Sequence, residues 1–487
     1  MPKDGTSVSS EDDGAVAANA GREARGLTRR SAIKRGGAAA LVASGAGALA
    51  SPAFAAPSRK GGDELHVGAG KAELKIPKPV YEAEGYANIH DPLYVRVVLA
   101  KARKKSLAIV VFDLTSINDS DVFTQLRSAI TKVSGIPGKD TVFSVTHMFS
   151  GPHVNGAPMP GQTATPDEGK WISNIVAATT AATKDAVKGM KKARVGYGTG
   201  RCGVNINRNL LTNEGWYLGP NSEGPSDKTV EVARFDDEAG DPIAILTNYS
   251  VQSSVMGASG MGPNSSTSGN SKYPYQVTAD LAGANAAWVE GQYDGVVAPF
   301  LCGATGDQQP IFRSLELLIN KELVTSTEDA GAAGFLLLKV QGQLLGMEVV
   351  RVAESIDTKP TSDLHLVATS ITVPILGRRT TPNAPTKAHL TYPPDGTAPL
   401  LVWVFRIGDG VFAGTPPELS TPTLEKIRKN SPFEHTFVMG MFEGGAKSMP
   451  DRWNFKHATY AAQDANWAPG DAEKYIEFVR PIIRSLH

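Results

Sequence analysis

Short apolar runs alternate with longer amphipathic segments over most of the chain. The runs at 94–99, 107–112 and 141–145 have the length of strands and are rich in β-branched residues. The run at 107–112 is apolar at every position, which is typical of a strand buried on both faces. We therefore predict three strands here, the second of them fully buried.

A helix is predicted between the second and third of these strands. Four apolar residues recur there at spacings of three and four, so that they share one face of a helix. They are Phe123, Leu126, Ile130 and Val133. Asp119 or Ser120 is available as the N-cap, which indicates where the helix begins.

The alternation continues to the end of the chain. Further helices are predicted near 168–190, 328–355 and 470–486, and further strands near 229–249, 296–301, 363–373, 400–414 and 435–441. This order of elements indicates the α/β fold class. Because no internal repeat or strong linker interrupts it, we predict one large domain at 57–487, although about 430 residues exceeds the usual size of a domain.

The first 56 residues differ from the rest and have the form of an export signal. A polar stretch leads to Arg29-Arg30, a Gly/Ala-rich run follows, and Ala53-Phe54-Ala55 has the small-x-small pattern of a signal-peptidase site. We interpret 1–56 as a twin-arginine signal peptide, with a disordered tail as the alternative. The expected location is secreted, periplasmic or in the cell envelope. No later segment offers the roughly 20 apolar residues that cross a bilayer, so we expect a soluble mature protein without a transmembrane anchor.

The composition excludes several classes of function. Basic and acidic residues number 49 each, which gives no electrostatic case for binding nucleic acid or an anionic membrane surface. The expected partner is therefore a small molecule or a lipid. Cys202 and Cys302 are the only cysteines, which excludes a cysteine-based zinc knuckle and permits at most one disulfide.

Common catalytic motifs are absent from the sequence. It contains no Gly-x-Ser-x-Gly elbow, no His-Glu-x-x-His helix and no Walker loop. The segment from Met256 to Tyr275 is rich in glycine, serine and asparagine, which indicates an irregular loop. A long loop within a compact domain is often functional, and a surface excursion is the alternative.

His147 is the first candidate functional residue. The predicted strand at 141–145 leads directly to it, and a Ser-Gly-Pro turn follows at 150–152. This arrangement presents the imidazole at the carboxyl end of a strand, where ligands usually bind in α/β sheets. Taken alone, the pattern fits either a hydrogen-bonded structural histidine or a ligand-binding one.

Several segments resemble the neutral ceramidase family. The family hallmark Thr-His-Thr-His-Ser-Gly-Pro is similar to Thr146-His147-Met148-Phe149-Ser150-Gly151-Pro152. Other similar segments are Val67-Gly68-Ala69-Gly70-Lys71-Ala72-Glu73-Leu74, Gly85-Tyr86-Ala87, Leu93-Tyr94-Val95-Arg96, Phe112-Asp113-Leu114, Ile206-Asn207-Arg208-Asn209, Gly306-Asp307-Gln308-Gln309-Pro310 and Pro416-Pro417-Glu418-Leu419. The resemblance implies an α/β catalytic domain with mixed β-sheets flanked by helices, ending where the family's C-terminal β-sandwich would begin.

The resemblance also implies a chemistry. Members of the family hydrolyse the amide of N-acylsphingosine with a zinc ion that is held by two histidines, a glutamate and a tyrosine. Zinc with one open position polarises a carbonyl and acidifies water. By position, His147 corresponds to the first zinc histidine and Glu418 to the zinc glutamate. Arg208 corresponds to the arginine near the reacting amide.

The sequence departs from the family at the remaining site positions. Phe149 replaces the second histidine of the hallmark, although His153 lies close enough in sequence to substitute for it. Gln252 stands where the second zinc histidine is expected, and Gln309 stands at the position of the catalytic serine. The segment that would carry the zinc tyrosine has none, and Tyr460 is the nearest candidate after it. We assign the phenylalanine, His153 and the two glutamines to the substrate-binding wall. The catalytic residues are predicted to be Arg208, Asp307 and Tyr460.

Gln252 and Gln309 change the chemistry that the resemblance implies. A neutral amide binds zinc far more weakly than an imidazole, so zinc is a candidate cofactor whose second histidine and tyrosine are missing. Gln309 cannot act as a nucleophile, because its amide has no useful lone pair for acyl transfer. A shift of a few residues in the alignment would instead make Ser250, Ser253 or Ser254 face the pocket.

Three hypotheses about the function remain. The first is an exported hydrolase of an amide or ester bond in a lipid-like substrate, with a metal or metal-activated water held by His147 and Glu418. His153 or Asp307 would complete that site, and Arg208 would steady the oxyanion.

The second hypothesis is a diverged, non-hydrolytic protein that binds a hydrophobic small molecule or catalyses a different reaction in the same pocket. The third is a purely structural surface protein. Each candidate residue also has a structural interpretation. Arg208 could be an ion-pair partner, and Glu418 could be a carboxylate preceding a helix at 421–428.

Overall fold

The computed structural model describes residues 64–155, 165–257, 275–376, 391–463 and 465–487. These residues all belong to one unit of the chain, Ala56–His487. The proposed signal peptide lies outside the described residues. Most of the predicted loop between Met256 and Tyr275 also lies outside them.

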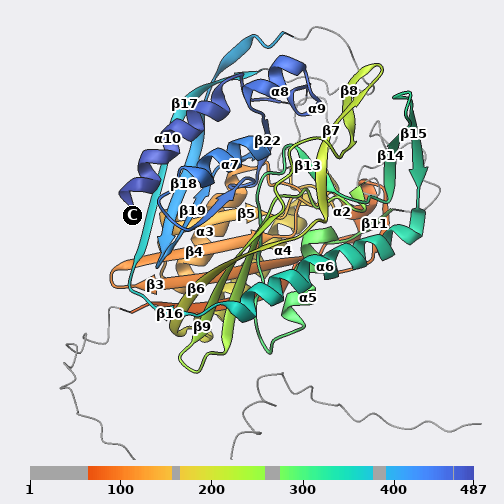
Figure 1. The fold of residues 1–487 in the computed structure, drawn as a ribbon. Helices are drawn as coiled ribbons and strands as arrows, with labels where there is room; N and C mark the ends of the chain where they lie inside the picture. Colours follow the sequence, from red (N-terminus) through yellow and green to blue (C-terminus); the bar gives the residue numbers. More distant parts are fainter. Residues whose placement is uncertain (1–63, 156–164, 258–274, 377–390, 464) are drawn as a thin grey trace, which may run out of the picture. The chain divides into compact units, whose positions relative to one another are not determined.

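A nine-stranded mixed sheet forms the centre of the fold (Figure 1). Its strands are β1 (His66–Glu73), β3 (Tyr94–Ala102), β4 (Lys105–Phe112), β5 (Thr141–Val145), β6 (Lys191–Arg201), β9 (Thr229–Asp237), β10 (Pro242–Tyr249), β12 (Phe300–Cys302) and β16 (Lys359–Pro360). In space they run β12-β10-β9-β6-β1-β3-β4-β5, with β16 beside β6. β4 pairs with β5 and β10 pairs with β12 in parallel, and the other neighbours are antiparallel.

A second sheet packs against one face of the first. It consists of β17 (Leu364–Leu376), β18 (Pro394–Ile407), β19 (Gly410–Gly414) and β21 (His435–Met439). Successive side chains of a strand point to opposite faces. Accordingly Phe405 and Ile407 of β18 pack in one hydrophobic cluster with Ile109 of β4, whereas Val402 and Val404 belong to the cluster on the far side of the second sheet.

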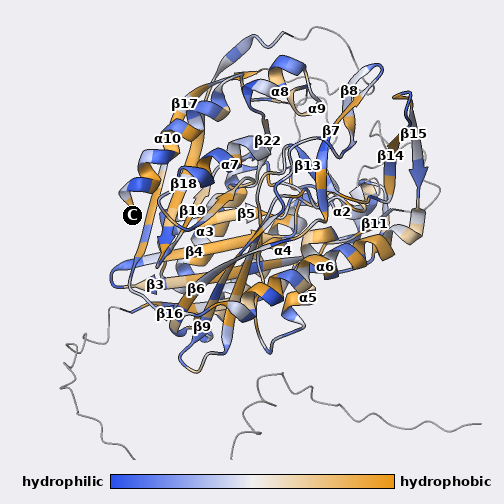
Figure 2. Ribbon diagram, viewed as in Figure 1, coloured by the Kyte–Doolittle hydropathy of each residue, from blue (hydrophilic) through white to orange (hydrophobic). Residues whose placement is uncertain are grey.

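Helices cover the two remaining faces. α3 (Ser120–Ser134), α4 (Glu168–Lys188), α5 (Asp280–Glu290) and α6 (Gly334–Ser355) lie on the first sheet, and α7 (Thr421–Lys429) and α10 (Asp471–Ser485) lie on the second. In β3, Val97 packs with the helices and Val98 packs with the second sheet. The strands of the two sheets are correspondingly hydrophobic along much of their length (Figure 2). The layers are therefore helix, sheet, sheet and helix.

Smaller elements connect these layers. They are α2 (Lys78–Ala83), β2 (Tyr86–Ile89), β7 (Asn205–Thr212), β8 (Gly215–Asn221), β11 (Tyr275–Val277), β13 (Gln308–Pro310), β14 (Leu315–Ile319), β15 (Thr325–Asp329), β20 (Pro417–Leu419), β22 (Ala446–Met449), α8 (Arg452–His457) and α9 (Tyr460–Gln463). β13, β7 and β8 form a three-stranded sheet, and β20 pairs with β22. Four of these elements, β7, β13, β20 and α9, each carry a residue that the sequence assigns to the site.

Most of the predicted elements are confirmed. The helix expected between 119 and 133 is α3, in which the Asp119 side chain accepts a hydrogen bond from the Asp121 backbone and Gly135 ends the helix with φ of 71°. Two boundaries were wrong. The helix predicted from 328 begins only at Gly334, because the preceding residues pair as β14 and β15, and the strand predicted at 296–301 is reduced to 300–302. The two cysteines are both free.

One helix in the described part of the chain, 331–355, is long and apolar enough to cross a membrane. Its residues Leu338, Leu345 and Val349 are buried in the main core cluster. The opposite face of the same helix exposes apolar side chains, which include Leu336 and Met347. The burial of one face against α5 and the sheet explains the apolar residues on that face only.

The close approach of α4 to β1 gives a prediction about stability. Gly68 of β1 lies so near the helix that a Cβ would overlap the carbonyl oxygen of Ala186. We expect Gly68→Ala to lower the free energy of unfolding by about 1–3 kcal/mol, because backbone has to move to make room. Gly169, in the same helix, has nothing within 4 Å of an added Cβ. Gly169→Ala should therefore be neutral or stabilising by up to about 1 kcal/mol. Urea denaturation of both variants measures this, and equal effects would contradict the packing argument.

Candidate functional site

The ends of three strands meet at one place in the fold. Val145 at the end of β5 accepts a hydrogen bond from the thiol of Cys302 at the end of β12. Just beyond β5 and β10, Met148 forms a parallel bridge with Ser253. The segments that follow β5, β10 and β12 carry His147, Gln252 and Gln309 respectively. The topology thus gathers residues from distant parts of the sequence at one edge, as it usually does in α/β sheets.

His147 is held from both sides of its ring. Its backbone has φ of 51°, a left-handed conformation that turns the chain sharply out of β5. Nδ1 lies 3.0 Å from the Thr115 carbonyl oxygen, and Nε2 lies 2.7 Å from Oε1 of Glu418. The ring of Phe149 meets the imidazole edge-on with 4.6 Å between centroids. The side chain is buried, so its orientation is fixed by these contacts.

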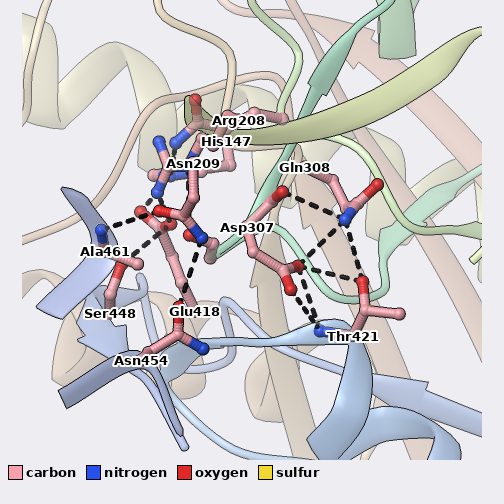
Figure 3. Close-up of polar contacts among 12 residues, drawn as sticks. His147, Arg208, Asn209, Asp307, Gln308, Glu418, Thr421, Ser448, Asn454 and Ala461 are labelled. Atoms are coloured by element: carbon pink, nitrogen blue, oxygen red, sulfur yellow. Dashed lines mark hydrogen bonds and ion pairs between the residues drawn. The ribbon is translucent and has the colours of Figure 1, made fainter. Parts of the chain in front are cut away.

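Glu418 lies between the His147 imidazole and the Arg208 guanidinium (Figure 3). Its Oε1 contacts His147, and its Oε2 accepts a hydrogen bond of 2.8 Å from Arg208 and one of 3.3 Å from the Ser448 hydroxyl. Burial alone would raise the pKa of this carboxyl, but the charges of Arg208 and His147 outweigh it and lower the pKa to about 2. Glu418 is therefore an ionised, buried carboxylate.

Arg208 is fixed on β7 by contacts on several sides. Its Nε donates to the Gly306 carbonyl oxygen at 3.0 Å, in addition to the ion pair with Glu418. Its guanidinium carbon lies 5.7 Å from the centroid of the Tyr460 ring, a cation–π arrangement. Tyr460 begins α9 and also meets the Tyr217 ring edge-on. The structure thus brings together His147, Glu418, Arg208 and Tyr460, as the sequence predicts.

Asp307 has different contacts, although it is close in sequence to the site. Both carboxylate oxygens accept hydrogen bonds of 3.0 Å from the backbone N–H of Thr421, the first residue of α7 (Figure 3). The Thr421 hydroxyl and the Gln308 amide also donate to it. Burial raises the pKa of Asp307 to about 7. Its contacts are those of a residue that caps α7, and among the described residues its side chain has no hydrogen bond with His147 or Glu418.

The two glutamines lie on different sides of the site. Nε2 of Gln252 is 3.4 Å from Nε2 of His147, so this amide borders the imidazole directly. Gln309, on β13, donates from Nε2 to Oε1 of Glu316 at 3.4 Å and leaves its own Oε1 buried without a partner. Gln252 is therefore in the position expected for a neighbour of His147, whereas Gln309 has Glu316 as its contact.

His153 does not join this group in the structure. Its backbone N–H and its Nδ1 both contact the carboxylate of Glu84, at 2.9 and 2.7 Å. Burial lowers the pKa of His153, but the hydrogen bond and charge of Glu84 outweigh burial and raise it. A histidine six residues after His147 can reach this partner because the Ser-Gly-Pro turn directs the chain toward α2. The expected substitution for the missing histidine therefore finds no support in these contacts.

Two of the three serines near Gln252 have hydroxyls that are hydrogen-bonded to other groups. The Ser250 hydroxyl donates to Asp227 at 3.1 Å, and the Ser253 hydroxyl accepts from the Ala282 backbone at 2.9 Å. Ser254 accepts through its carbonyl oxygen from Arg313. None of these contacts resembles a serine activated by a neighbouring base.

Sequence reasoning missed two charged residues beside the site, Arg313 and Glu316. They follow β13, and the charges of Arg208 and Tyr460 act on Arg313. No motif marks them, because they stand just after the similar segment Gly306-Asp307-Gln308-Gln309-Pro310 and outside it. Their position beside Gln309 is the one signal that could have drawn attention to them.

The described residues do not fit a protein-bound zinc ion. A catalytic zinc usually has three protein ligands. His147 and Glu418 are two strong donors, but the next neighbour, Gln252, offers a neutral amide, and Arg208 adds positive charge 2.8 Å from Glu418. Within the described ranges, no group of three or more His, Cys, Asp or Glu residues is arranged to hold a metal. His147 and Glu418 alone do not make a complete set of ligands for a catalytic zinc.

A cavity of about 940 Å³ lies elsewhere on the same unit. It is bounded by α5 and α6 and by the ion pairs that join Arg96 to Asp113 and Glu290. None of the residues that the sequence assigns to the site lines it. The buried residues around Glu418 therefore do not belong to this cavity.

Two solved structures have the same fold as this chain. One is a neutral ceramidase from Pseudomonas aeruginosa, with a TM-score of 0.65, 16% identity, and coverage of 87% of this chain and 74% of that one. The other is a ceramidase complexed with C2, with a TM-score of 0.64, 16% identity, and coverage of 87% and 75%. No protein-family model and no curated protein sequence matches the chain. The likeness confirms the predicted α/β fold of the neutral ceramidase type.

The pKa of Glu418 leads to a prediction about acid stability. A carboxyl whose pKa falls from 4.5 to about 2 on folding stabilises the protein above pH 4.5, and this contribution disappears as the pH falls toward 2. Its full size is on the order of 3 kcal/mol. We expect Glu418→Gln to lower stability near pH 7 by about that amount and to lose less stability than wild type between pH 5 and pH 2.

Urea denaturation at a series of pH values measures this difference. Glu477 on α10 is exposed to solvent and serves as the matched control. Its replacement by glutamine should leave the slope unchanged. Parallel stability curves for wild type and Glu418→Gln below pH 5 would rule out the lowered pKa.

Proposed function

We propose that the chain is an exported hydrolase that cleaves an amide or ester bond in a lipid-like substrate. One observation carries this proposal, the buried carboxylate of Glu418 held between the His147 imidazole and the Arg208 guanidinium. The fold supports it, because two solved structures with this fold are described as ceramidases. Export rests on the twin-arginine pattern at the start of the sequence.

The hydrogen bonds of His147 suggest how it takes part. Nδ1 faces a backbone carbonyl and Nε2 faces an ionised carboxylate, and both of these groups are acceptors. The ring satisfies both contacts only when it carries a proton on each nitrogen. We propose that His147 acts as a general acid, giving the Nε2 proton to the leaving nitrogen or oxygen of the substrate as water adds to the carbonyl carbon.

Glu418 and Arg208 would complete the reaction. When His147 gives up its proton, Glu418 loses one of the two charges that lower its pKa, and it becomes a better acceptor for a proton of the attacking water. Arg208 would stabilise the oxyanion that develops on the substrate carbonyl oxygen. The proton taken by Glu418 then returns to Nε2 of His147. Water is consumed, and the acyl bond is divided between an acid and an amine or alcohol.

A second candidate function is binding without hydrolysis. The position given to the catalytic serine by the resemblance holds Gln309, and its amide donates to Glu316. The hydroxyls of Ser250 and Ser253 are engaged with Asp227 and with the Ala282 backbone, so neither is free to act as a nucleophile in its place. A protein with this site could retain a hydrophobic ligand and leave its bonds intact.

Hydrolysis by the purified protein separates the two candidates. With p-nitrophenyl acyl esters and acyl p-nitroanilides as substrates, we expect His147→Ala to lower kcat/KM at least about 100-fold, because it removes the general acid. His365 is exposed on β17, and His365→Ala is the matched control that should retain full activity. Equal activity of wild type and His147→Ala would exclude the proposed acid.

Elemental analysis of the same samples tests the metal-assisted alternative. Without a third ligand, we expect no stoichiometric metal in the wild type. Near-stoichiometric metal that is lost in both His147→Ala and Glu418→Ala would replace the acid–base scheme by metal-assisted hydrolysis. Binding of acyl compounds without turnover would favour the second candidate.

A further inference from the structure

Small residues on α5 leave room for a cavity beside α6. Gly283, Ala287 and Gly291 follow one another at intervals of four, so they lie on one face of α5 and its C-terminal end. All three line the cavity of about 940 Å³, to which α6 contributes Phe335 and Leu336. A cavity of this volume can hold a small-molecule ligand.

The cavity has an exposed mouth and a buried floor. At the mouth, Ala287 is exposed and Leu336 keeps 64% of its surface in contact with solvent. Arg96 on β3 and Asp113, which directly follows β4, also line the cavity but are only 2% and 1% exposed. A ligand that enters between the helices would therefore pass apolar side chains and then meet buried charges.

The buried charges of the floor are hydrogen-bonded except at one oxygen. Arg96 donates from Nη1 to Oδ2 of Asp113 at 2.9 Å and from Nε to Oε1 of Glu290 at 2.8 Å. Lys71 contacts the other oxygen of Glu290 at 2.7 Å. Oδ1 of Asp113 is buried and has no hydrogen-bond partner among the described residues. Because an unpaired buried acceptor costs free energy, this oxygen is suited to a donor that a ligand supplies.

The charges around the cavity favour a cationic ligand. Apart from His90, the ionisable residues with acidic or basic side chains in its lining are Asp91, Asp113, Asp280, Glu290, Lys71, Arg96 and Lys339. Acidic groups thus outnumber basic ones by one. Asp280 is held by hydrogen bonds from the Ser150 hydroxyl and from the backbone of Val255 and Met256. A ligand with one positive charge would balance the lining, whereas an anion would add to the excess.

We propose that this cavity binds an organic cation that consists of a primary ammonium group on an apolar body. The ammonium donates to Oδ1 of Asp113, and the apolar body lies against Trp288, Phe335 and Leu336. The His90 ring stacks on Phe335 with 3.8 Å between centroids, which supports this apolar wall. The inference does not rest on the proposed function, because none of the residues assigned to hydrolysis lines the cavity.

Binding of matched probes to the purified protein tests this proposal. Octylammonium has the charge and N–H donors, octan-1-ol has a donor without the charge, and octyltrimethylammonium has the charge without a donor. Octanoate has the opposite charge. By isothermal titration calorimetry near pH 7, we expect octylammonium to bind about 10- to 100-fold more tightly than octan-1-ol or octyltrimethylammonium, and octanoate to bind more weakly than all three.

Two substitutions test whether the binding takes place in this cavity. Ala287→Trp places a large side chain at the mouth and leaves the ion pairs intact, and it should weaken octylammonium binding at least about 10-fold. Ala181 is exposed on α4 and does not line the cavity, so Ala181→Trp is the matched control. Asp113→Asn should weaken octylammonium binding about 10- to 100-fold and change octan-1-ol binding little. If Asp113→Asn fails to fold because Arg96 loses its partner, Ala287→Trp still decides.

Three results would overturn the proposal. The first is equal affinity of the wild type for octylammonium and for either octan-1-ol or octyltrimethylammonium, which would leave Oδ1 of Asp113 to a bound water. The second is unchanged octylammonium binding in Ala287→Trp, which would place the binding elsewhere. The third is full affinity in a folded Asp113→Asn variant. Titration of His147→Ala separates this inference from the proposed function, because octylammonium binding should be unchanged there whether or not hydrolysis is lost.

Discussion

The functional edge of this fold depends on the burial of one ionised carboxylate. Glu418 comes from β20, next to the second sheet, His147 follows β5 of the first sheet, and Arg208 lies on β7. Removing a carboxylate from water costs several kcal/mol, and only close, well-aligned cations offset that cost. The contacts of 2.7 and 2.8 Å meet this requirement. These contacts join segments that are far apart in the sequence, so no single helix or hairpin can form them. The geometry of the site therefore depends on the packing of the two sheets.

The sequence reveals those parts of the fold that are decided locally. The buried strand at 107–112 is recognisable because every position is apolar, and α3 is recognisable because Asp119 caps an apolar stripe that ends at Gly135. The hairpin of β14 and β15 escapes the same reasoning. Its residues are partly or fully exposed, and what orders them is pairing with each other rather than a buried face. Apolar periodicity carries no information about such an element.

The candidate site also contains some residues that local sequence reveals and others that only contacts between distant segments reveal. A strand that runs into His147 is a local signal, and resemblance to a family places Glu418 and Arg208 beside it. The partner of His153 could not be inferred this way, because Glu84 lies in a separate segment that is brought near only by the Ser-Gly-Pro turn. Arg313 was missed for a related reason. Its side chain contacts the Ser254 carbonyl oxygen, 59 residues away, and such a contact leaves no pattern in the sequence.

The hydrogen bonds of His147 limit the chemistry that this site can support at one time. A metal at Nε2 needs the lone pair of that nitrogen, whereas the contact with ionised Glu418 needs a proton on it. The two states exclude each other. Arg208 favours the proton-bearing state, since a metal would add further positive charge next to a carboxylate that already has one guanidinium at 2.8 Å. With Gln252 in place of a third charged or imidazole ligand, the balance moves away from the metal. In the proposed function, His147 and Glu418 would therefore act as an acid and its counter-ion rather than as metal ligands.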